Sequence, residues 1–334
     1  MCSGGILIIL CSCNGERYIA AQIESILGQT EPGIRLLISD DCSSDHTAEI
    51  AARYAERFPA RVSLVRRSAS SGGAARHFMT VLKDAEKLRA DDGSGADYVM
   101  FADQDDVWHP DKAEKTLRVM RRAEKRRGAD TALLVHCDMR ITDAAGRVKA
   151  DSYVRYQQMS PSRRQLNQLL VQNNVTGGAM MMNRALVELL RRHPVPEHAV
   201  MHDHWIALTA AAFGEIVFLD EPLYDYRQHG GNVLGAAKGG GLREIADRLG
   251  LFRTDGKTKA DMDRRSASVY TALFRQAAEF GRQYGAELSS PQKKTLRRFL
   301  FLPKKTRIGK IIGILRYGFT FNRLHRTAGE CLFL

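Results

Sequence analysis

The 334-residue sequence predicts an α/β protein with a mostly parallel sheet, helices on both faces of that sheet, and a helical C-terminal extension. Three observations predict this class. Apolar segments alternate with amphipathic ones through the first half, and the first apolar segments are continuous enough to be covered on both faces. Glycine clusters then precede a purely helical pattern. Right-handed crossovers would place the strands side by side.

Strands and helices alternate regularly through the first half of the chain. Ile6–Leu10 is a continuous apolar run, which is typical of a parallel strand buried on both faces. Ile19, Ile23 and Ile26 form one helical stripe, and Pro110 marks the start of a later helix. Strands are predicted over residues 6–10, 34–38, 62–65 and 98–102, and helices over residues 18–29, 47–58, 75–88 and 110–127.

The second half is more mixed and becomes helical towards its end. Glycine clusters at 230–231 and 239–241 mark a boundary, and we divide the chain into domains 1–235 and 236–334. Before the boundary, the pattern predicts helices over 162–171, 185–192 and 202–213, and strands over 133–136, 178–182, 216–219 and 224–227. After it, helices are predicted over 242–251, over 257–284 and in the tail.

The composition indicates a folded protein that does not span a membrane. Its 44% hydrophobic and 26% charged residues are ordinary for a globular chain. No apolar run approaches the length that crosses a bilayer, and Met1–Gly5 lacks the features of a secretory signal. We therefore expect a cytoplasmic location. The six cysteines are expected as reduced thiols, because their spacing fits neither a zinc site nor a disulfide pair.

Positive charge is concentrated at the C-terminal end. Residues 291–334 contain eleven Lys and Arg and one Glu, so this basic tail carries +10 of the formal net charge of +12. Ile308, Ile311, Ile312 and Leu315 fall at helical spacing within it. Such a helix can lie on an anionic membrane surface, or its apolar stripe can pack on the body of the protein. Nucleic acid ranks low as a partner, because no nucleic-acid-binding module accompanies the charge.

Acidic residues collect where two predicted strands end. Asp40 and Asp41 follow the second strand, and Asp103, Asp105 and Asp106 follow the fourth. Ligands of open α/β sheets bind beyond these ends, and clustered carboxylates suit Mg²⁺ or Mn²⁺. The alternative is a solvated loop in which one Asp caps the next helix. The first strand is not followed by a dinucleotide-binding glycine motif, and no P-loop is present.

Six segments in order resemble the signatures of family 2 glycosyltransferases, in the bacterial rhamnosyltransferase-like branch. They are 12–16 (Ser-Cys-Asn-Gly-Glu), 39–45 (Ser-Asp-Asp-Cys-Ser-Ser-Asp), 101–108 (Phe-Ala-Asp-Gln-Asp-Asp-Val-Trp), 174–178 (Asn-Val-Thr-Gly-Gly), 202–205 (His-Asp-His-Trp) and 226–232 (Tyr-Arg-Gln-His-Gly-Gly-Asn). The resemblance covers residues 5–235 and implies the GT-A fold, a Rossmann-like arrangement.

The resemblance also implies roles for individual residues. Asp41 would hold the pyrimidine base of a nucleotide-sugar donor, Asp105 a divalent metal, and Asp203 would be the catalytic base. The donor side would comprise Cys11, Cys13, Glu16, Asp41, Arg76 and Gln104; the metal side Asp103, Asp105 and His229; and the acceptor or sugar side Trp205, Gly177 and Gly178.

Several of these residues could instead have a purely structural role. Asp203 begins an apolar helix, where an acid commonly interacts with the helix dipole, and His229 could be a hydrogen-bonded structural residue. Arg76 could be a surface arginine, and Gly177-Gly178 a tight strand entry. Cys42 stands where the family usually has glycine.

The resemblance implies an inverting transferase, which would move rhamnose from dTDP or a hexose from UDP to a lipid-linked or surface-polysaccharide acceptor at the inner face of the membrane. Since Mg²⁺ or Mn²⁺ can take the leaving group's charge, one carboxylate suffices to deprotonate the acceptor hydroxyl. The alternatives are a sugar nucleotidyltransferase and a non-catalytic adaptor that binds a nucleotide sugar or a membrane. Specificity in such folds lies in loops, so the motifs leave the sugar and the linkage open.

Overall fold

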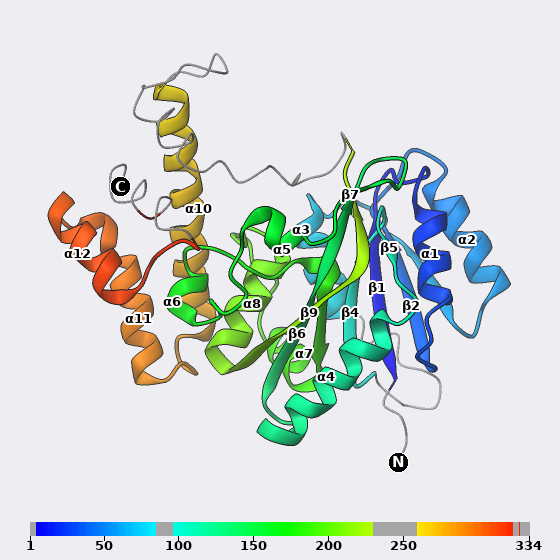
Figure 1. Cartoon of the computed structure of the whole chain (residues 1–334), viewed down its shortest axis with the longest axis horizontal. Helices are drawn as coiled ribbons and strands as arrows, with labels where there is room; N and C mark the ends of the chain where they lie inside the picture. Colours follow the sequence, from blue (N-terminus) through cyan, green and yellow to red (C-terminus); the bar gives the residue numbers. More distant parts are fainter. Residues whose placement is uncertain (1–4, 85–95, 230–258, 323–326, 328–334) are drawn as a thin grey trace.

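The computed structural model describes residues 5–84, 96–229, 259–322 and 327. Within these residues nine strands form one sheet, in the order β3-β2-β1-β4-β8-β6-β9-β5, with β7 beside β6 (Figure 1). The strands are β1 (Ile6–Ser12), β2 (Ile34–Asp40), β3 (Val62–Arg66), β4 (Tyr98–Asp103), β5 (Val107–Trp108), β6 (Ala132–Thr142), β7 (Val148–Ala150), β8 (Met180–Asn183) and β9 (Gly214–Arg227).

Most of the sheet runs in one direction. Strands β3, β2, β1 and β4 are mutually parallel. Strand β8 is antiparallel to both β4 and β6, so β6 and its parallel neighbour β9 run the same way as β4. The mostly parallel sheet predicted from the sequence is confirmed.

Helices cover both faces of the sheet, as predicted. The side chains of β1 alternate: Ile8 and Leu10 join one hydrophobic cluster with helices α1 and α4, whereas Ile9 joins a second cluster with α3, α7 and α8. The helices are α1 (Ile19–Leu27), α2 (Thr47–Arg57), α3 (Ala74–Asp84), α4 (Lys112–Arg127), α5 (Tyr153–Gln157), α6 (Leu166–Leu169), α7 (Arg184–Arg192), α8 (His202–Phe213), α10 (Lys259–Tyr284), α11 (Ser290–Leu300) and α12 (Arg307–Tyr317), with short 3₁₀ turns η2 (Gly177–Ala179) and η3 (Leu302–Lys304).

The second half departs from prediction in its details. The strands predicted over 216–219 and 224–227 are parts of one continuous strand, β9. Pro222 lies opposite Asp138 where the register with β6 shifts, so a bulge accommodates the proline that interrupts the strand pattern. The helix predicted over 162–171 is reduced to α6, and β5, β7 and α5 are too short to leave a periodic signal. The helix predicted over 242–251 and the boundary at 235 lie outside the described residues.

The C-terminal helices complete the core of the preceding residues. On α10, Phe280 and Tyr284 are fully buried and pack against Trp205 of α8, with ring centroids 5.5 and 6.1 Å from that of Trp205. Gln276 of α10 also lies 3.2 Å from the ring of His204. The region after 259 therefore shares one apolar cluster with α8. None of the helices in the described ranges is long and apolar enough to cross a bilayer.

Candidate functional site

The carboxyl ends of β1, β2 and β4 place the predicted acidic loops side by side. In the sheet register, Ser12 of β1 pairs with Asp40 of β2, and Cys11 pairs with Asp103 of β4. The backbone N–H of Asp41 donates to Ser12 O at 2.8 Å, which ties the second loop to the first. The meeting of the two acidic loops at one sheet edge is confirmed.

Asp41 is buried and held by the loop that follows β3. Its Oδ1 accepts hydrogen bonds from the N–H of Ser71 at 2.7 Å and the hydroxyl of Ser71 at 2.9 Å, and Arg67 Nε lies 3.6 Å away. The next residue, Cys42, has φ of 60°, the left-handed region that a glycine adopts easily. The turn therefore keeps a left-handed residue at this position although the side chain is cysteine.

The first loop is fixed by two residues that were predicted to bind the donor. Gln104 pairs with the backbone of Cys13 twice, with Oε1 accepting from the N–H at 2.9 Å and Nε2 donating to the carbonyl at 3.0 Å. Gly15 lies so close that a Cβ there would sit 2.2 Å from Gln104 Oε1. Glu16 accepts from both the N–H and the ring Nδ1 of His46 at 2.9 Å, at the start of α2. Gln104 and Glu16 thus position this loop.

The thiols at this edge differ in exposure. Cys11 is buried at the end of β1, whereas Cys13 is exposed in the first loop. Burial and the neighbouring carboxylates Asp103 and Asp41 raise the pKa of Cys11 well above its usual value. Burial, then Asp41, also raises the pKa of Cys13. Both side chains are therefore neutral thiols at physiological pH.

Asp105 and His229 meet, as the resemblance implied. His229 Nε2 lies 2.8 Å from Asp105 Oδ2, and its ring stacks on Tyr18 with the centroids 4.7 Å apart. The neighbouring Asp103 is partly exposed. Burial, followed by the negative charges of Asp105 and Asp203, raises the pKa of Asp103 to about 7. Repulsion among these acids therefore contributes to the raised pKa of Asp103.

A buried lysine and a third acid complete the site, and neither was among the residues to which the resemblance assigned a role. Asp106, counted in the sequence among the clustered acids after the fourth strand, is buried, and its Oδ1 accepts from the N–H of Arg227 at 3.3 Å. Lys112 is fully buried, and its Nζ donates to Gly178 O at 2.5 Å and lies 3.5 Å from the centroid of the Trp108 ring. Burial lowers the pKa of Lys112 to about 8.

The signal for Lys112 was present in the sequence. Lys112, Thr116 and Met120 recur every four residues and lie on the buried side of α4. A lysine on such an apolar stripe must be paired or pack against aromatic rings.

Asp203 lies on the other side of the glycine pair. Its Oδ1 accepts from Asn173 Nδ2 at 3.0 Å and its Oδ2 accepts from the N–H of Gly177 at 3.2 Å. A Cβ on Gly178 would stand 3.2 Å from the Oδ2 atoms of both Asp103 and Asp106. Two consecutive glycines therefore separate the predicted base from the acidic loop. Burial raises the pKa of Asp203 to about 7.

The prediction that Trp205 contacts a sugar is wrong. Trp205 is 1% exposed and packs against Phe280 and Tyr284 of α10. Two residues advance a helix by about 200°, so Trp205 faces the core when Asp203 faces the site. The flanking His202 is also buried, and burial lowers its pKa to about 3. Arg76 is exposed in the first turn of α3.

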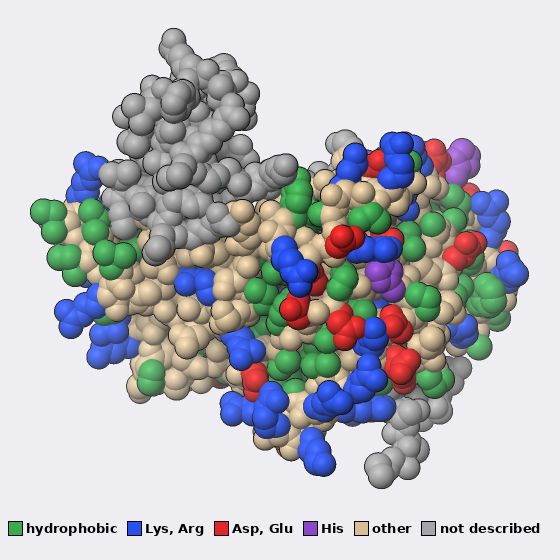
Figure 2. Space-filling view, viewed as in Figure 1, with side chains coloured by type: hydrophobic (Ala, Val, Ile, Leu, Met, Phe, Trp, Pro, Cys, Tyr) green, Lys and Arg blue, Asp and Glu red, His purple; other side chains and the backbone are tan. Residues whose placement is uncertain are grey.

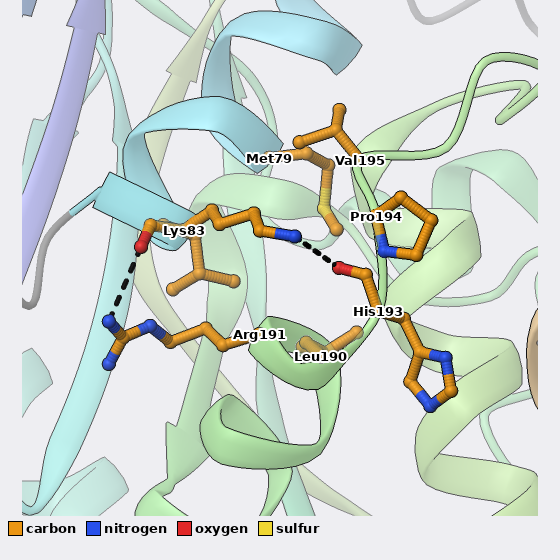
Figure 3. A pocket seen from close by; sticks show the side chains of 8 residues that line it. Met79, Lys83, Leu190, Arg191, His193, Pro194 and Val195 are labelled. Carbon is orange, nitrogen blue, oxygen red and sulfur yellow. Dashed lines mark hydrogen bonds between the residues drawn. The ribbon is translucent and has the colours of Figure 1, made fainter.

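A small pocket lies elsewhere, between α3 and α7 (Figure 3). Its polar groups bond to one another: Lys83 Nζ donates to His193 O at 2.7 Å, and Arg191 Nη2 donates to Lys83 O at 3.3 Å. The remaining lining residues are Met79, Leu82, Leu190, Pro194 and Val195. None of the predicted site residues lines this pocket.

Comparison with proteins of known structure supports the fold. The S. aureus protein TarS, solved in complex with UDP, superposes with a TM-score of 0.53 at 16% sequence identity, over 94% of this chain and 80% of the solved chain. This similarity shows that the chain has the GT-A fold.

Comparison with curated sequences points to the same class. The chain is 34% identical over 104 residues to a dTDP-rhamnosyl transferase, RfbG, of Shigella flexneri, covering 31% of this chain and 34% of that protein. It is 34% identical over 116 residues to a UDP-Glc:alpha-D-GlcNAc-diphosphoundecaprenol beta-1,3-glucosyltransferase, WfgD, of Escherichia coli, covering 34% of this chain and 40% of that protein. These matches span well under half of either relative. The model of glycosyl transferase family 2 matches residues 7–190, more than half of the chain, which therefore belongs to this family of glycosyltransferase enzymes.

Proposed function

We propose that the protein is an inverting, metal-dependent glycosyltransferase. It would move a sugar, rhamnose or a hexose, from a dTDP or UDP donor to a hydroxyl of a lipid-linked or surface-polysaccharide acceptor. The observation that carries this proposal is the convergence of Asp203 and the acidic loop on the two sides of Gly177-Gly178. The similarities to a dTDP-rhamnosyl transferase and to a glucosyltransferase that acts on a diphosphoundecaprenol-linked sugar support the donor and acceptor classes.

Asp203 is the proposed catalytic base. Asp203 is half-buried as a residue, and two N–H donors hold the orientation of its carboxylate. A pKa of about 7 lets the carboxylate take up a proton near neutral pH. Attack from the face opposite the leaving group would invert the anomeric centre, and no second carboxylate is then needed as nucleophile.

The donor is proposed to lie along the ends of β1 and β2. Asp41 would hold the base beside Cys11 and Cys13, and Arg76 would approach the phosphates from α3. Asp41 is already oriented by Ser71, which is the rigidity that selective recognition requires. Gln104 and Glu16 would act on the donor through the first loop, whose backbone they hold.

Asp103, Asp105 and His229 would hold Mg²⁺ or Mn²⁺. Among the residues that the structure describes, no three His, Cys, Asp or Glu side chains are already grouped so that they could hold a metal ion. The donor set nevertheless fits these ions, which usually take one or two carboxylates together with water and phosphate oxygens. The buried Oδ2 of Asp106, beside these residues, has no hydrogen-bond partner. When bound, the ion would neutralise charge developing on the departing diphosphate.

A screen of nucleotide sugars tests the proposal. The protein is incubated with dTDP and UDP sugars and with polyprenyl-diphosphate-linked acceptors, with and without Mn²⁺ or Mg²⁺, and release of the nucleoside diphosphate is followed. We expect release with one donor, dependent on the metal, and a product of inverted anomeric configuration by NMR. Binding of a nucleotide sugar without release, across all acceptors, would identify an adaptor instead. Formation of pyrophosphate from a sugar phosphate and a nucleoside triphosphate would identify a nucleotidyltransferase.

The acceptor class also bears on location. A lipid-linked acceptor would place the enzyme at the inner face of the cell membrane, as a peripheral protein of the cytoplasm. The basic tail is the proposed contact with that surface, because it carries most of the net positive charge.

A further inference from the structure

Helix α12 is packed on the protein by one side and leaves apolar residues exposed on the other. Gly313 and Ile314 are buried, and a Cβ on Gly313 would lie 2.8 Å from Leu302 of η3. Ile308, Ile312 and Leu315 are 72%, 55% and 61% exposed. One face of α12 therefore packs on the body of the protein, while Ile308, Ile312 and Leu315 of the apolar stripe remain exposed.

The three exposed residues form one stripe. Ile308, Ile312 and Leu315 are spaced by four and three residues, which places them on the same helix face. Exposed basic side chains lie around them, at Lys304, Lys305, Arg307 and Arg316. Figure 2 shows hydrophobic side chains gathered at the end of the molecule where α12 lies, with Lys and Arg beside them. This combination is typical of a helix that lies in a membrane interface.

The helix is formed and fixed before any partner arrives. The hydroxyl of Thr306 accepts from the N–H of Gly309 at 3.2 Å at its start, and Gly318 ends it with φ of 68°. Asn167 Nδ2 of α6 donates to Tyr317 O at 2.9 Å, which ties the end of α12 to the body. Docking would therefore not require the helix to fold at the surface.

We propose that α12 docks the protein on a bilayer that contains anionic lipid, with Ile308, Ile312 and Leu315 inserted into the interface. The positive charge of residues 291–334 complements an anionic surface. The same charge opposes the pairing of two copies through this face, because a two-fold interface would bring like charges together. The inference is independent of the transfer chemistry and adds a defined surface to the proposed function.

Vesicle flotation tests the apolar part of this proposal, on the full chain and without donor or acceptor. The probe is phosphatidylcholine vesicles with and without phosphatidylglycerol. We expect flotation only with the anionic vesicles, and its loss in the triple variant Ile308→Ser, Ile312→Ser, Leu315→Ser. The matched control changes three exposed valines elsewhere, Val148→Ser, Val200→Ser and Val269→Ser, which are 40–48% exposed. This control should float like the unchanged protein.

A second pair of variants tests the charge. Lys304→Gln, Lys305→Gln and Arg316→Gln together should lower vesicle partition by about a hundredfold, because each basic residue near an anionic surface contributes about fivefold. The control removes three exposed charges from α4, with Arg118→Gln, Arg122→Gln and Lys125→Gln, and should change partition little. Circular dichroism and thermal unfolding would check that all variants fold.

Three results would overturn the proposal. The first is that the unchanged protein does not float, and the second is that the α12 variants float as well as the unchanged protein. The third is a change from dimer to monomer in the apolar α12 variant, measured by light scattering, which would assign this face to contact with a second copy. Since flotation needs neither donor nor metal, a failed nucleotide-sugar screen would not affect this result, and failed flotation would not affect the screen.

Discussion

The carboxylate of Asp203 is oriented by neutral N–H groups of Asn173 and Gly177. Replacement Asp203→Asn keeps the size of the side chain and removes its ability to accept a proton. We expect turnover to fall by about 10²–10⁴-fold, the usual contribution of a general base. Donor affinity by calorimetry should stay unchanged, because Asp203 would act on the acceptor. The exposed Asp130→Asn serves as control and should keep full turnover. Equal turnover in both variants would remove Asp203 from the chemistry.

The pKa of Asp203 predicts a pH profile. Burial raises this pKa to about 7, and a base works only when deprotonated. The rate kcat/KM should therefore rise with pH and level off above about 7, with a fall of about tenfold per pH unit on the acid side. The measurement is the pH–rate profile of donor consumption. In the Asp203→Asn variant, the residual rate should no longer fall on the acid side. A fall that persists in this variant would be caused by the titration of another group.

At the scale of the element, the 3₁₀ turn η2 connects the two halves of the site. Gly177 donates to Asp203, and Gly178 accepts from Lys112 and lies against Asp103 and Asp106. Glycine suits both positions, because a Cβ at Gly177 would meet the ring of His202 and a Cβ at Gly178 would meet Asp103 and Asp106. The turn therefore sets the separation between the proposed base and the acidic loop.

Gly177→Ala tests the role of this turn. The new Cβ would stand 2.4 Å from His202 Nε2, and the His202 ring is packed on Phe78 with centroids 4.2 Å apart. We expect a loss of about 1–3 kcal/mol of unfolding free energy from overpacking, and lower turnover because the N–H that orients Asp203 shifts. Thermal unfolding and turnover are measured together. Gly5→Ala, whose Cβ would meet only an ordinary contact at 3.7 Å, is the control. An unchanged Gly177→Ala variant would show that the turn tolerates displacement.

At the scale of the whole molecule, the C-terminal helices and the transferase fold share a hydrophobic cluster. Trp205 is enclosed because α10 lies against α8. The family match ends at residue 190, well before the helix that completes this core. Stability of the site should therefore depend on residues far from it in the sequence.

Phe280→Ala measures that dependence. Phe280 is fully buried against Trp205, so its truncation should lower the free energy of unfolding by about 3–5 kcal/mol. Phe301→Ala, at a position 51% exposed, should have little effect. Chemical denaturation followed by fluorescence of the tryptophans and by circular dichroism would give one cooperative transition. Two separate transitions, with the first confined to the C-terminal helices, would instead show that these helices unfold on their own.

Much of the architecture and part of the site could be predicted from the sequence. Continuous apolar runs located β1, β2 and β4, and the acids that follow them had to meet at one edge because parallel strands end together. Asp105 and His229, 124 residues apart, could be paired only through the family resemblance. Hydrophobic periodicity could not show that β9 continues through Pro222, because the pattern does not reveal the bulge that accommodates the proline.

The sequence by itself determined the α/β class, the edge where carboxylates gather and the family to which the chain belongs, because these depend on local periodicity and on short motifs. Tertiary structure alone decided that Trp205 faces α10, that Lys112 and Asp106 are buried beside Gly178, and that α12 exposes Ile308, Ile312 and Leu315 while burying Ile314. The burial or exposure of each of these side chains depends on the residues that pack against it, and those residues are distant in the chain.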